Sequence, residues 1–438
     1  MRSDSAPVRT RPASSGRFTV PNLRWFIVAL LFLVTVLNYV DRQTLSVLAP
    51  FLRDELHMSN EDYAIVVTAF LVSYTVMQAV SGIIVDRIGT RWGFVLMFVW
   101  WSLSTTLHRW AIGVRSLAVF RLLLGIGEAG NWPGAAKAIA EWFPHRERAF
   151  AMGIFNAGSG TGALVAPPLI AYVTLHYGWR NAFVVVGLGG SVWLLAWLVL
   201  YRRPEEHPLI SSDELALIVD DPDDQVTPQG PRIRWLQLLS FREVWGIMLA
   251  RWLTDPVWWF YVFWLPEYLK RERGFTLATI GLLAWIPFLA ADMGCIFGGW
   301  TSDYFIRRGW SIDKARKVVL VCSALLTIDA LLVVQTKNSL FAIVLISIAV
   351  FGVQSWGTLL LAMPADLFPS NVVASVSGLS GVGAGLGGVL FTLLTGYLLD
   401  HFSYKPVLAL AAAMHPVGFL VLLWAIPNIR QLRRNWSD

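Results

Sequence analysis

The chain has 438 residues, of which 56% are hydrophobic and 15% are charged, and its mean hydropathy is +0.57. In soluble globular proteins about 25% of residues are charged, so this composition excludes that class and indicates a polytopic protein of the lipid bilayer. The sequence pI is about 9.4, but the basic residues are spread over short loops, which argues against a nucleic-acid partner.

The chain begins with a polar, basic stretch at residues 1–23 that has no apolar core and no obvious cleavage site. We therefore expect a cytosolic tail and not a signal peptide. Twelve apolar runs follow, and each has about the 20 residues that a membrane-spanning helix needs. The runs lie near residues 24–50, 62–85, 92–111, 116–140, 149–174, 180–201, 243–269, 277–302, 317–336, 340–366, 373–399 and 405–427.

This order predicts an all-α membrane protein, with six spans before a polar stretch and six after it. Lys and Arg residues concentrate in the loops on the side of the N-terminus, and positively charged loops remain in the cytosol. We therefore expect both termini and the central loop to be cytosolic. The expected segments are a tail at 1–23, a six-helix bundle at 24–201, a linker at 202–241, a second bundle at 242–428 and a tail at 429–438.

The first span carries two charged neighbours, Asp41 and Arg42, near its end. Adjacent helical residues point about 100° apart, so one side chain can face a cavity while the other reaches sideways. An arginine offers a carboxylate a planar fork of donors. A buried carboxyl group favours its neutral form and can load and release a proton near neutrality. These are the parts that a proton–anion symporter needs.

The fourth span contains Arg121 and Glu128 inside an apolar segment. Seven residues make about two turns, so both side chains lie on one helical face. A charge at membrane depth is costly unless it meets a partner or a water-filled cavity, and small residues nearby allow close approach. The pattern predicts that this helix lines a polar path through the protein. The alternative is an ion pair that only holds helices together. The small residues are Gly125, Gly127, Ala129, Gly130 and Gly134.

The linker is rich in acidic residues and prolines, and we expect a solvated connector with one short amphipathic helix. It contains no enzymatic motif. Its acidic residues are Asp213, Glu214, Asp220, Asp221, Asp223 and Asp224.

Further charged residues and both cysteines lie within the apolar runs of the second half. Arg251 stands one turn before Asp255, so the two can neutralise each other, whereas Asp292 and Asp329 receive no role. The cysteines, Cys295 and Cys322, lack metal-ligand spacing and are expected to be packing residues. We therefore predict neither a metal site nor a cofactor.

Neutral polar and aromatic side chains in the spans are candidates to bind the hydroxyls or the ring of a sugar. Each could equally be a packing residue or an interhelical hydrogen-bond partner. Trp258, Trp259 and Tyr261 are ambiguous between a gate and the core. The candidates are Tyr39, Tyr74, Gln78, Asn131, Gln354, Ser355 and Trp356.

The two halves repeat one another. Gly82-x3-Asp86-Arg87 returns as Gly299-x3-Asp303 after 217 residues, and Trp142-Phe143-Pro144 returns as Leu367-Phe368-Pro369 after 225. Repeated halves are typical of transporters that bind substrate between them and rock to expose it to alternate sides. The loop charges are expected to form a cytosolic gate, or else only to orient the chain: Asp86, Arg87, Arg91, Asp303, Arg307 and Arg308.

These motifs resemble known ones. The run from Gly82 to Arg91 is similar to the cytosolic loop signature of the major facilitator superfamily, and Arg121-x3-Gly125-x-Gly127 to the fourth-helix motif of its proton-coupled members. Residues 37–42, 120–137 and 255–261 resemble bacterial hexuronate transporters of the anion:cation symporter family.

There are two departures from the superfamily patterns. Tyr304 replaces the basic residue after the aspartate of the second loop motif. The fifth span reads Gly158-x3-Gly162-x3-Ala166-Pro167-Pro168, which is not the signature of drug/proton antiporters and argues against efflux.

The resemblance implies a major facilitator fold with 12 transmembrane helices in two pseudo-symmetric halves. It also implies roles: Asp41 and Glu128 as proton carriers, Arg121 as their coupling partner and Arg42 as the ligand of a substrate carboxylate. The alternative is a structural network among these four, with the substrate bound elsewhere.

The implied function is import of hexuronates such as glucuronate and galacturonate by a monomer in the bacterial inner membrane, driven by protons. Aldonate or aldarate carriers of galactonate or glucarate share much of the pattern, as do carriers of other organic anions. A transporter-like sensor would need an added cytosolic domain, for which the linker and tail leave no room. No metal cluster, nucleophile triad or phosphate loop suggests an enzyme.

Overall fold

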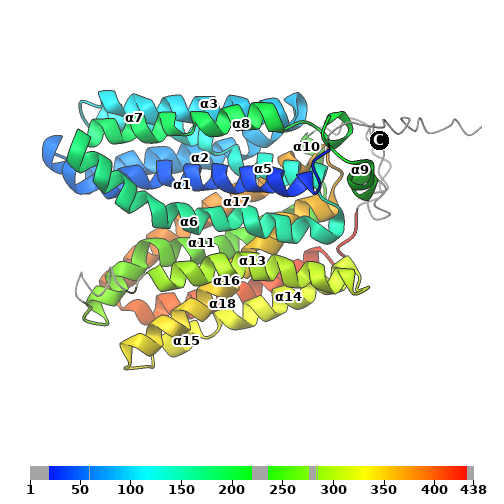
Figure 1. The fold of residues 1–438 in the computed structure, drawn as a ribbon. Helices are drawn as coiled ribbons and strands as arrows, with labels where there is room; N and C mark the ends of the chain where they lie inside the picture. Colours follow the sequence, from blue (N-terminus) through cyan, green and yellow to red (C-terminus); the bar gives the residue numbers. More distant parts are fainter. Residues whose placement is uncertain (1–18, 59, 220–234, 276–282, 284, 432–438) are drawn as a thin grey trace, which may run out of the picture.

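The computed structural model describes residues 19–58, 60–219, 235–275, 283 and 285–431. In these segments the regular structure is helical, and long, roughly parallel helices form two bundles that lie side by side (Figure 1). One bundle comes from the first half of the chain and the other from the second half.

The first bundle contains six helical rods, as the apolar runs predict. Two rods are broken: α4 and α5 are separated at Ala129 and Gly130, and α7 and α8 at Gly190. The helices are α1 (Leu23–Glu55), α2 (Asn60–Ile88), α3 (Thr90–Leu107), α4 (Val114–Glu128), α5 (Asn131–Trp142), α6 (His145–Tyr177), α7 (Trp179–Gly189) and α8 (Ser191–Leu200).

The second bundle repeats this arrangement, with one break between α14 and α15 at Ile328 and Asp329. Residues 277–282, the predicted start of the eighth span, lie outside the described residues. The helices are α11 (Arg242–Arg271), α13 (Trp285–Arg307), α14 (Ile312–Thr327), α15 (Ala330–Val333), α16 (Ser339–Leu367), α17 (Val373–His401) and α18 (Tyr404–Ala425).

Seven described helical stretches are long and apolar enough to cross a membrane by length and composition. The broken rod of α7 and α8 meets this criterion as one stretch, Trp179–Leu200, whereas α4, α5 and α14 are each too short, with 15, 12 and 16 residues. Large apolar side chains cover the outer faces, among them Val192 at 76% exposure and Trp424 at 74%. Such outward apolar surfaces suit contact with lipid.

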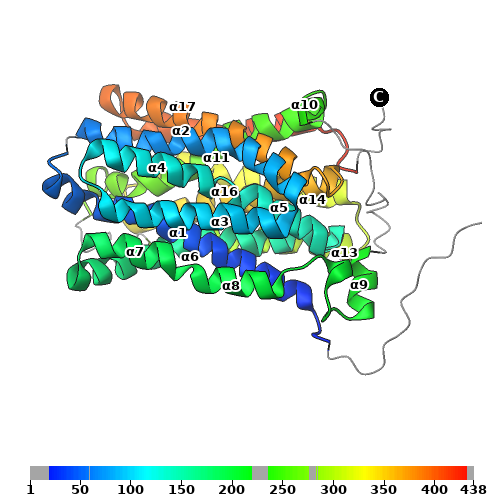
Figure 2. The ribbon, with the colours of Figure 1, turned by 90° about the horizontal axis from the view of Figure 1, so that it is seen from above.

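The linker meets one end of the bundle, which we call the linker end. It contains α9 (Ser212–Val219) and α10 (Trp235–Leu238), whereas residues 220–234 lie outside the described part, as do residues 1–18 and 432–438 of the tails. Figure 2 shows α9 and α10 at the same end of the molecule.

Glu214 on α9 corrects the expectation of a fully solvated connector. This side chain is buried and accepts hydrogen bonds from the backbone N–H groups of Leu23, at 2.9 Å, and Arg24, at 3.1 Å. Its carboxylate also pairs with the guanidinium of Arg24 at 2.8 Å. Because the first N–H groups of a helix lack intrahelical partners, Glu214 completes the start of α1 and fixes the linker to the first bundle.

The two bundles touch through glycines. In both views α2 lies beside α17, and α6 packs on α13 (Figures 1 and 2). A Cβ atom on Gly153 would collide with the carbonyl oxygen of Cys295, and one on Gly299 with that of Ala149. Gly82 and Gly378 make the equivalent contacts on the other side, against the backbone of Ala374 and Gln78. Only glycine allows the helices of the two halves to approach so closely.

Candidate functional site

A cavity lies between the bundles, with about 680 Å³ of space that no atom fills, including space open to solvent. Helices of both halves line it. The first half contributes Tyr39, Arg42, Tyr74, Gln78, Trp132 and Asn156; the second contributes, among others, Arg251, Thr254, Asp255, Trp258, Gln354, Trp356 and His415.

Arg42 presents its guanidinium to this cavity from an aromatic cage. The guanidinium carbon lies 5.0 Å from the ring centre of Tyr39, 5.3 Å from that of Phe70 and 4.8 Å from that of Tyr74. Aromatic faces attract a cation at such distances. Arg42 Nη2 also lies 3.0 Å from Glu128 Oε2, and the Arg42 side chain is 21% exposed while Glu128 is fully buried. The arginine therefore faces the open space and its counter-ion lies behind it.

Asp41 and Arg121 lie behind the cavity wall with Glu128. All three are buried, and Arg121 packs over the ring of Phe70 at 4.9 Å. Among the described residues, Asp41 Oδ1, Glu128 Oε1 and the Nε and Nη1 atoms of Arg121 have no hydrogen-bond partner. Two basic and two acidic side chains thus share one pocket of the first half, and Arg42 is the member that reaches the cavity.

Five of the seven predicted neutral ligands line the cavity, and two do not. Asn131 is buried and donates from Nδ2 to Thr35 Oγ1 at 3.2 Å, while its neighbour Trp132 faces the cavity. Ser355 Oγ lies 2.8 Å from Ser323 Oγ on α14. The members on the cavity are Tyr39, Tyr74, Gln78, Gln354 and Trp356.

The structure adds cavity residues that the sequence analysis did not propose as ligands. Arg251 and Asp255 form the expected ion pair, with 2.7 Å between Arg251 Nη2 and Asp255 Oδ2, but the pair lines the cavity. His415, on α18, also lines it. The sequence feature that could have identified His415 is a single histidine within an apolar span.

Two aspartates connect the halves at the linker end. Asp86 on α2 accepts hydrogen bonds from the N–H of Ser375, at 2.7 Å, and its hydroxyl, at 2.6 Å, in the first turn of α17. Lys137 Nζ lies 2.9 Å from Asp86 Oδ1. Asp303 on α13 accepts from the N–H of Phe150 on α6 at 2.7 Å. Phe150 and Ser375 are 225 residues apart, so the repeat places equivalent contacts on both sides.

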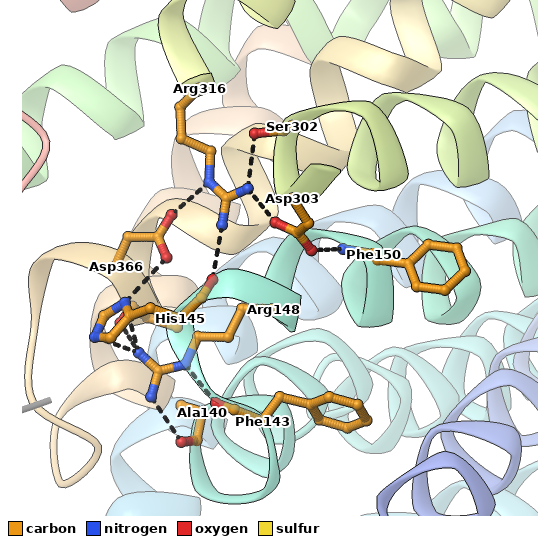
Figure 3. Close-up of polar contacts among 10 residues, drawn as sticks. Ala140, Phe143, His145, Arg148, Phe150, Ser302, Asp303, Arg316 and Asp366 are labelled. Carbon is orange, nitrogen blue, oxygen red and sulfur yellow. Dashed lines mark hydrogen bonds and ion pairs between the residues drawn. The ribbon is translucent and has the colours of Figure 1, made fainter. Parts of the chain in front are cut away.

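A buried network around Arg316 on α14 extends the contact at Asp303 (Figure 3). Arg316 Nη1 lies 2.6 Å from Asp303 Oδ1, and its Nε lies 2.9 Å from Asp366 Oδ2 on α16. Its Nη2 donates to the carbonyl oxygen of His145 in the other half at 3.3 Å, and Arg148 Nη1 donates to the carbonyl oxygen of Ala365 at 2.8 Å. The network therefore ties the start of α6 to three helices of the second bundle.

The repeat contains a signal for this network. Arg316 and Asp366 stand 225 residues after Arg91 and Glu141, the offset found for the Trp142-Phe143-Pro144 motif. An acid and a base at matching places in both halves could have drawn attention to them.

The other predicted gate residues take no part in these contacts. Arg91 Nη2 donates to the carbonyl oxygen of Leu198, within the first bundle, at 2.5 Å. Arg87, Arg307 and Arg308 are exposed, and Arg308 lies over the ring of Tyr304 at 5.0 Å. In the described part of the chain, the cations at the two aspartates are instead Lys137 and Arg316.

The two acids without a predicted role lie at helix contacts. Asp292 Oδ2 accepts from Thr161 Oγ1 at 3.2 Å, between α13 and α6. Asp329 stands at the break between α14 and α15, and neither of its carboxylate oxygens has a hydrogen-bond partner among the described residues.

Replacing Arg316 with methionine should destabilise the protein, because it leaves Asp303 and Asp366 buried without their cation. Breaking a buried ion pair typically costs about 3–5 kcal/mol. We expect the melting temperature of the purified protein in detergent to fall by several degrees. The matched control is Arg308→Met, which removes an exposed arginine and should leave the melting temperature unchanged. Equal melting temperatures for wild type and Arg316→Met would contradict the role given to this network.

Comparison with known proteins identifies the family. Residues 31–358 match the family model of the Major Facilitator Superfamily. The chain is 35% identical over 411 residues to a hexuronate transporter of Escherichia coli, covering 93% of this chain and 95% of that protein. It is 35% identical over 314 residues to a galacturonate transporter of Dickeya chrysanthemi, covering 71% of this chain and 91% of that one.

A further relative and a solved structure extend the comparison. A probable galactarate/D-glucarate transporter, GarP of Escherichia coli, is 31% identical over 428 residues, covering 93% and 96% of the two chains. The crystallised proton:xylose symporter XylE shares the fold, with a TM-score of 0.74 at 16% identity over 92% of this chain and 96% of that one. The chain therefore belongs to the major facilitator superfamily, with its twelve membrane-spanning helices in two halves, and it is a transporter and not an enzyme.

Proposed function

We propose that the protein is a proton-coupled symporter that imports sugar acids, with hexuronates such as glucuronate and galacturonate as its substrates. The observation that carries this proposal is the guanidinium of Arg42, which faces the cavity from an aromatic cage with a buried carboxyl group behind it. The names of the relatives, a hexuronate and a galacturonate transporter, support the same substrate class.

The coupling follows from competition for Arg42. With Glu128 ionised, its carboxylate occupies part of the fork of donors that a substrate carboxylate would use. A proton on Glu128 neutralises it and leaves Arg42 to the substrate, because a planar guanidinium suits a bidentate carboxylate. Proton and anion then load together. Asp41, buried beside Glu128, would carry the proton on, and the permanent positive charge of Arg121 would compensate the carboxylates when they are ionised.

We also propose how the protein is oriented in the membrane and that it acts as a single chain. The linker end, with the described ends of the chain, would face the cytosol of a bacterium, and the contacts of Asp86 and Asp303 would close the cavity on that side. The cavity would then open alternately to the two sides of the inner membrane. The protein would work as a monomer, with protons alone as coupling ions.

A second candidate substrate class is the aldonates and aldarates. GarP, a probable galactarate/D-glucarate transporter, and a D-galactonate transporter of Escherichia coli are relatives at 31% and 28% identity. The observation in favour of the aldarates is a second arginine in the cavity, Arg251, which would meet a second carboxylate only if its ion pair with Asp255 were broken.

The test is uptake into proteoliposomes. Labelled glucuronate should accumulate inside when an inward proton gradient is imposed, and a protonophore should abolish the accumulation. A thermal-shift panel of hexuronates, aldonates, aldarates and neutral sugars would first choose the substrate, since a ligand of the folded state raises its stability. If no sugar acid is taken up in response to the gradient, the proposal fails.

A further inference from the structure

The wall of the cavity contributed by the second half holds a guanidinium–carboxylate pair of its own. Arg251 Nη2 and Nε lie 2.7 Å and 2.8 Å from Asp255 Oδ2, one turn further along α11. Arg251 Nη1 also donates to Ser380 Oγ on α17 at 2.9 Å. Both charged side chains line the cavity, with 9% and 18% of their surface exposed. The arginine is therefore held on two sides before any substrate arrives.

This pair differs from the pair at Arg42 in where its carboxylate lies. Glu128 lies behind Arg42 and has no exposed surface, so a carboxylate that approaches from the cavity meets the guanidinium before it meets Glu128. Asp255 is more exposed than Arg251 and stands on the cavity wall itself. A carboxylate that approaches Arg251 would meet the like charge of Asp255, and like charges at close range repel.

The same cavity is lined by a buried polar group, His415, that has no hydrogen-bond partner among the described residues. His415 is fully buried and stands edge-on to Trp356, with 5.6 Å between ring centres. Neither ring nitrogen has a hydrogen-bond partner among the described residues. A buried donor or acceptor without a partner costs free energy, so a hydroxyl group that reached this part of the cavity would be stabilised there. Gln354 lines the same cavity and offers an amide.

We propose that Arg251, Asp255, Gln354 and His415 form a hydroxyl subsite, which receives the uncharged end of a sugar acid and rejects a second carboxylate. The paired charges present donors and an acceptor with no net charge, which suits a run of hydroxyl groups. The subsite rests on the proposed function, in which Arg42 holds the carboxylate at the other end. It makes the protein selective for monocarboxylates, the hexuronates and aldonates, over dicarboxylate aldarates.

The test removes the charge of Asp255 and keeps its shape. In the wild type, glucuronate should bind at least about tenfold more tightly than glucarate. In Asp255→Asn, the positive charge of Arg251 is no longer opposed by a carboxylate. The affinity for glucarate relative to glucuronate should therefore rise by about tenfold or more. Isothermal titration of the purified protein with each acid at one pH gives the ratio. Asp292→Asn is the matched control, because it makes the same charge change outside this cavity wall.

The measured affinities distinguish failure of the hydroxyl subsite from failure of the proposed function. Equal affinity of the wild type for glucuronate and glucarate would overturn the subsite, although the protein would still be a sugar-acid carrier. An unchanged ratio in Asp255→Asn would also overturn it. If neither acid nor any other sugar acid binds the wild type, the proposed function itself fails. Asp255→Ser is a second charge-removing variant should the asparagine variant not fold, and the wild-type ratio needs no variant.

Discussion

Sugar acids should no longer bind measurably once Arg42 is replaced with alanine. The variant loses the guanidinium that faces the cavity, and the aromatic cage of Tyr39, Phe70 and Tyr74 is left without its cation. Truncating one partner of a buried, hydrogen-bonded charge pair costs about 2–5 kcal/mol, so we expect the dissociation constant for glucuronate to rise by about 30-fold or more. Isothermal titration of the purified variant measures it.

Two further variants make this experiment specific. Arg42→Lys keeps the charge but not the planar fork, and it should bind with intermediate affinity. Arg308→Ala removes an exposed arginine far from the cavity and should bind as the wild type does. If Arg42→Ala keeps the wild-type affinity, the carboxylate is bound elsewhere and the charged cluster of the first half is structural.

Replacing Glu128 with glutamine should separate transport from its driving force. Glutamine imitates the protonated carboxyl group, so Arg42 stays available to the substrate and exchange of internal for external substrate should continue. No proton can be carried at this position, so accumulation driven by a proton gradient should be lost. Counterflow and gradient-driven uptake, measured in the same proteoliposomes, distinguish the two activities.

The control for this variant is Glu141→Gln. Glu141 lies on α5 in the same half and accepts a hydrogen bond from the Tyr201 hydroxyl at 2.6 Å, away from the cavity wall. Gradient-driven accumulation should persist in it. Should Glu128→Gln still concentrate substrate against its gradient, proton coupling would have to be assigned to another group.

The architecture was predictable because membrane spans can be recognised as apolar runs and the two halves can be recognised from repeated motifs. Each apolar run predicted by the sequence contains described helix, and the resemblance to the major facilitator superfamily is confirmed by its family model. The boundaries of the tails, bundles and linker remain predictions. Burial of Glu214 could not be foreseen, because its partner Arg24 is 190 residues away in the chain.

The cavity lining was predictable only to the extent that the phase of each helix was known. Gln354, Ser355 and Trp356 are consecutive, and three consecutive residues of a helix span too wide an arc to face one cavity. Ser355 is the one turned away, toward Ser323. Asn131 follows the break between α4 and α5, which interrupts the helical phase that the glycines before it would suggest.

The two aspartates that connect the halves could be located from the sequence, but their cationic partners could not. Asp86 and Asp303 stand out within a repeated motif, whereas their cations come from other helices, Lys137 on the fourth rod and Arg316 on the ninth. The spacing of residues along the chain does not predict contacts between side chains on different helices. Arg91, a loop arginine nearer to Asp86 in sequence, instead contacts α8.

The glycine contacts between the bundles bear on how many states the transporter can occupy. At Gly153 and Gly299 the backbones of α6 and α13 touch with no side chain between them. Dispersion at such a contact decays so steeply that a gap of about 0.5–1 Å already forfeits a quarter to a half of it. A partly separated interface would thus lose a substantial part of this attraction together with the close fit. The bundles should therefore switch between a seated and a separated arrangement, and a small difference in free energy would suffice to choose between them.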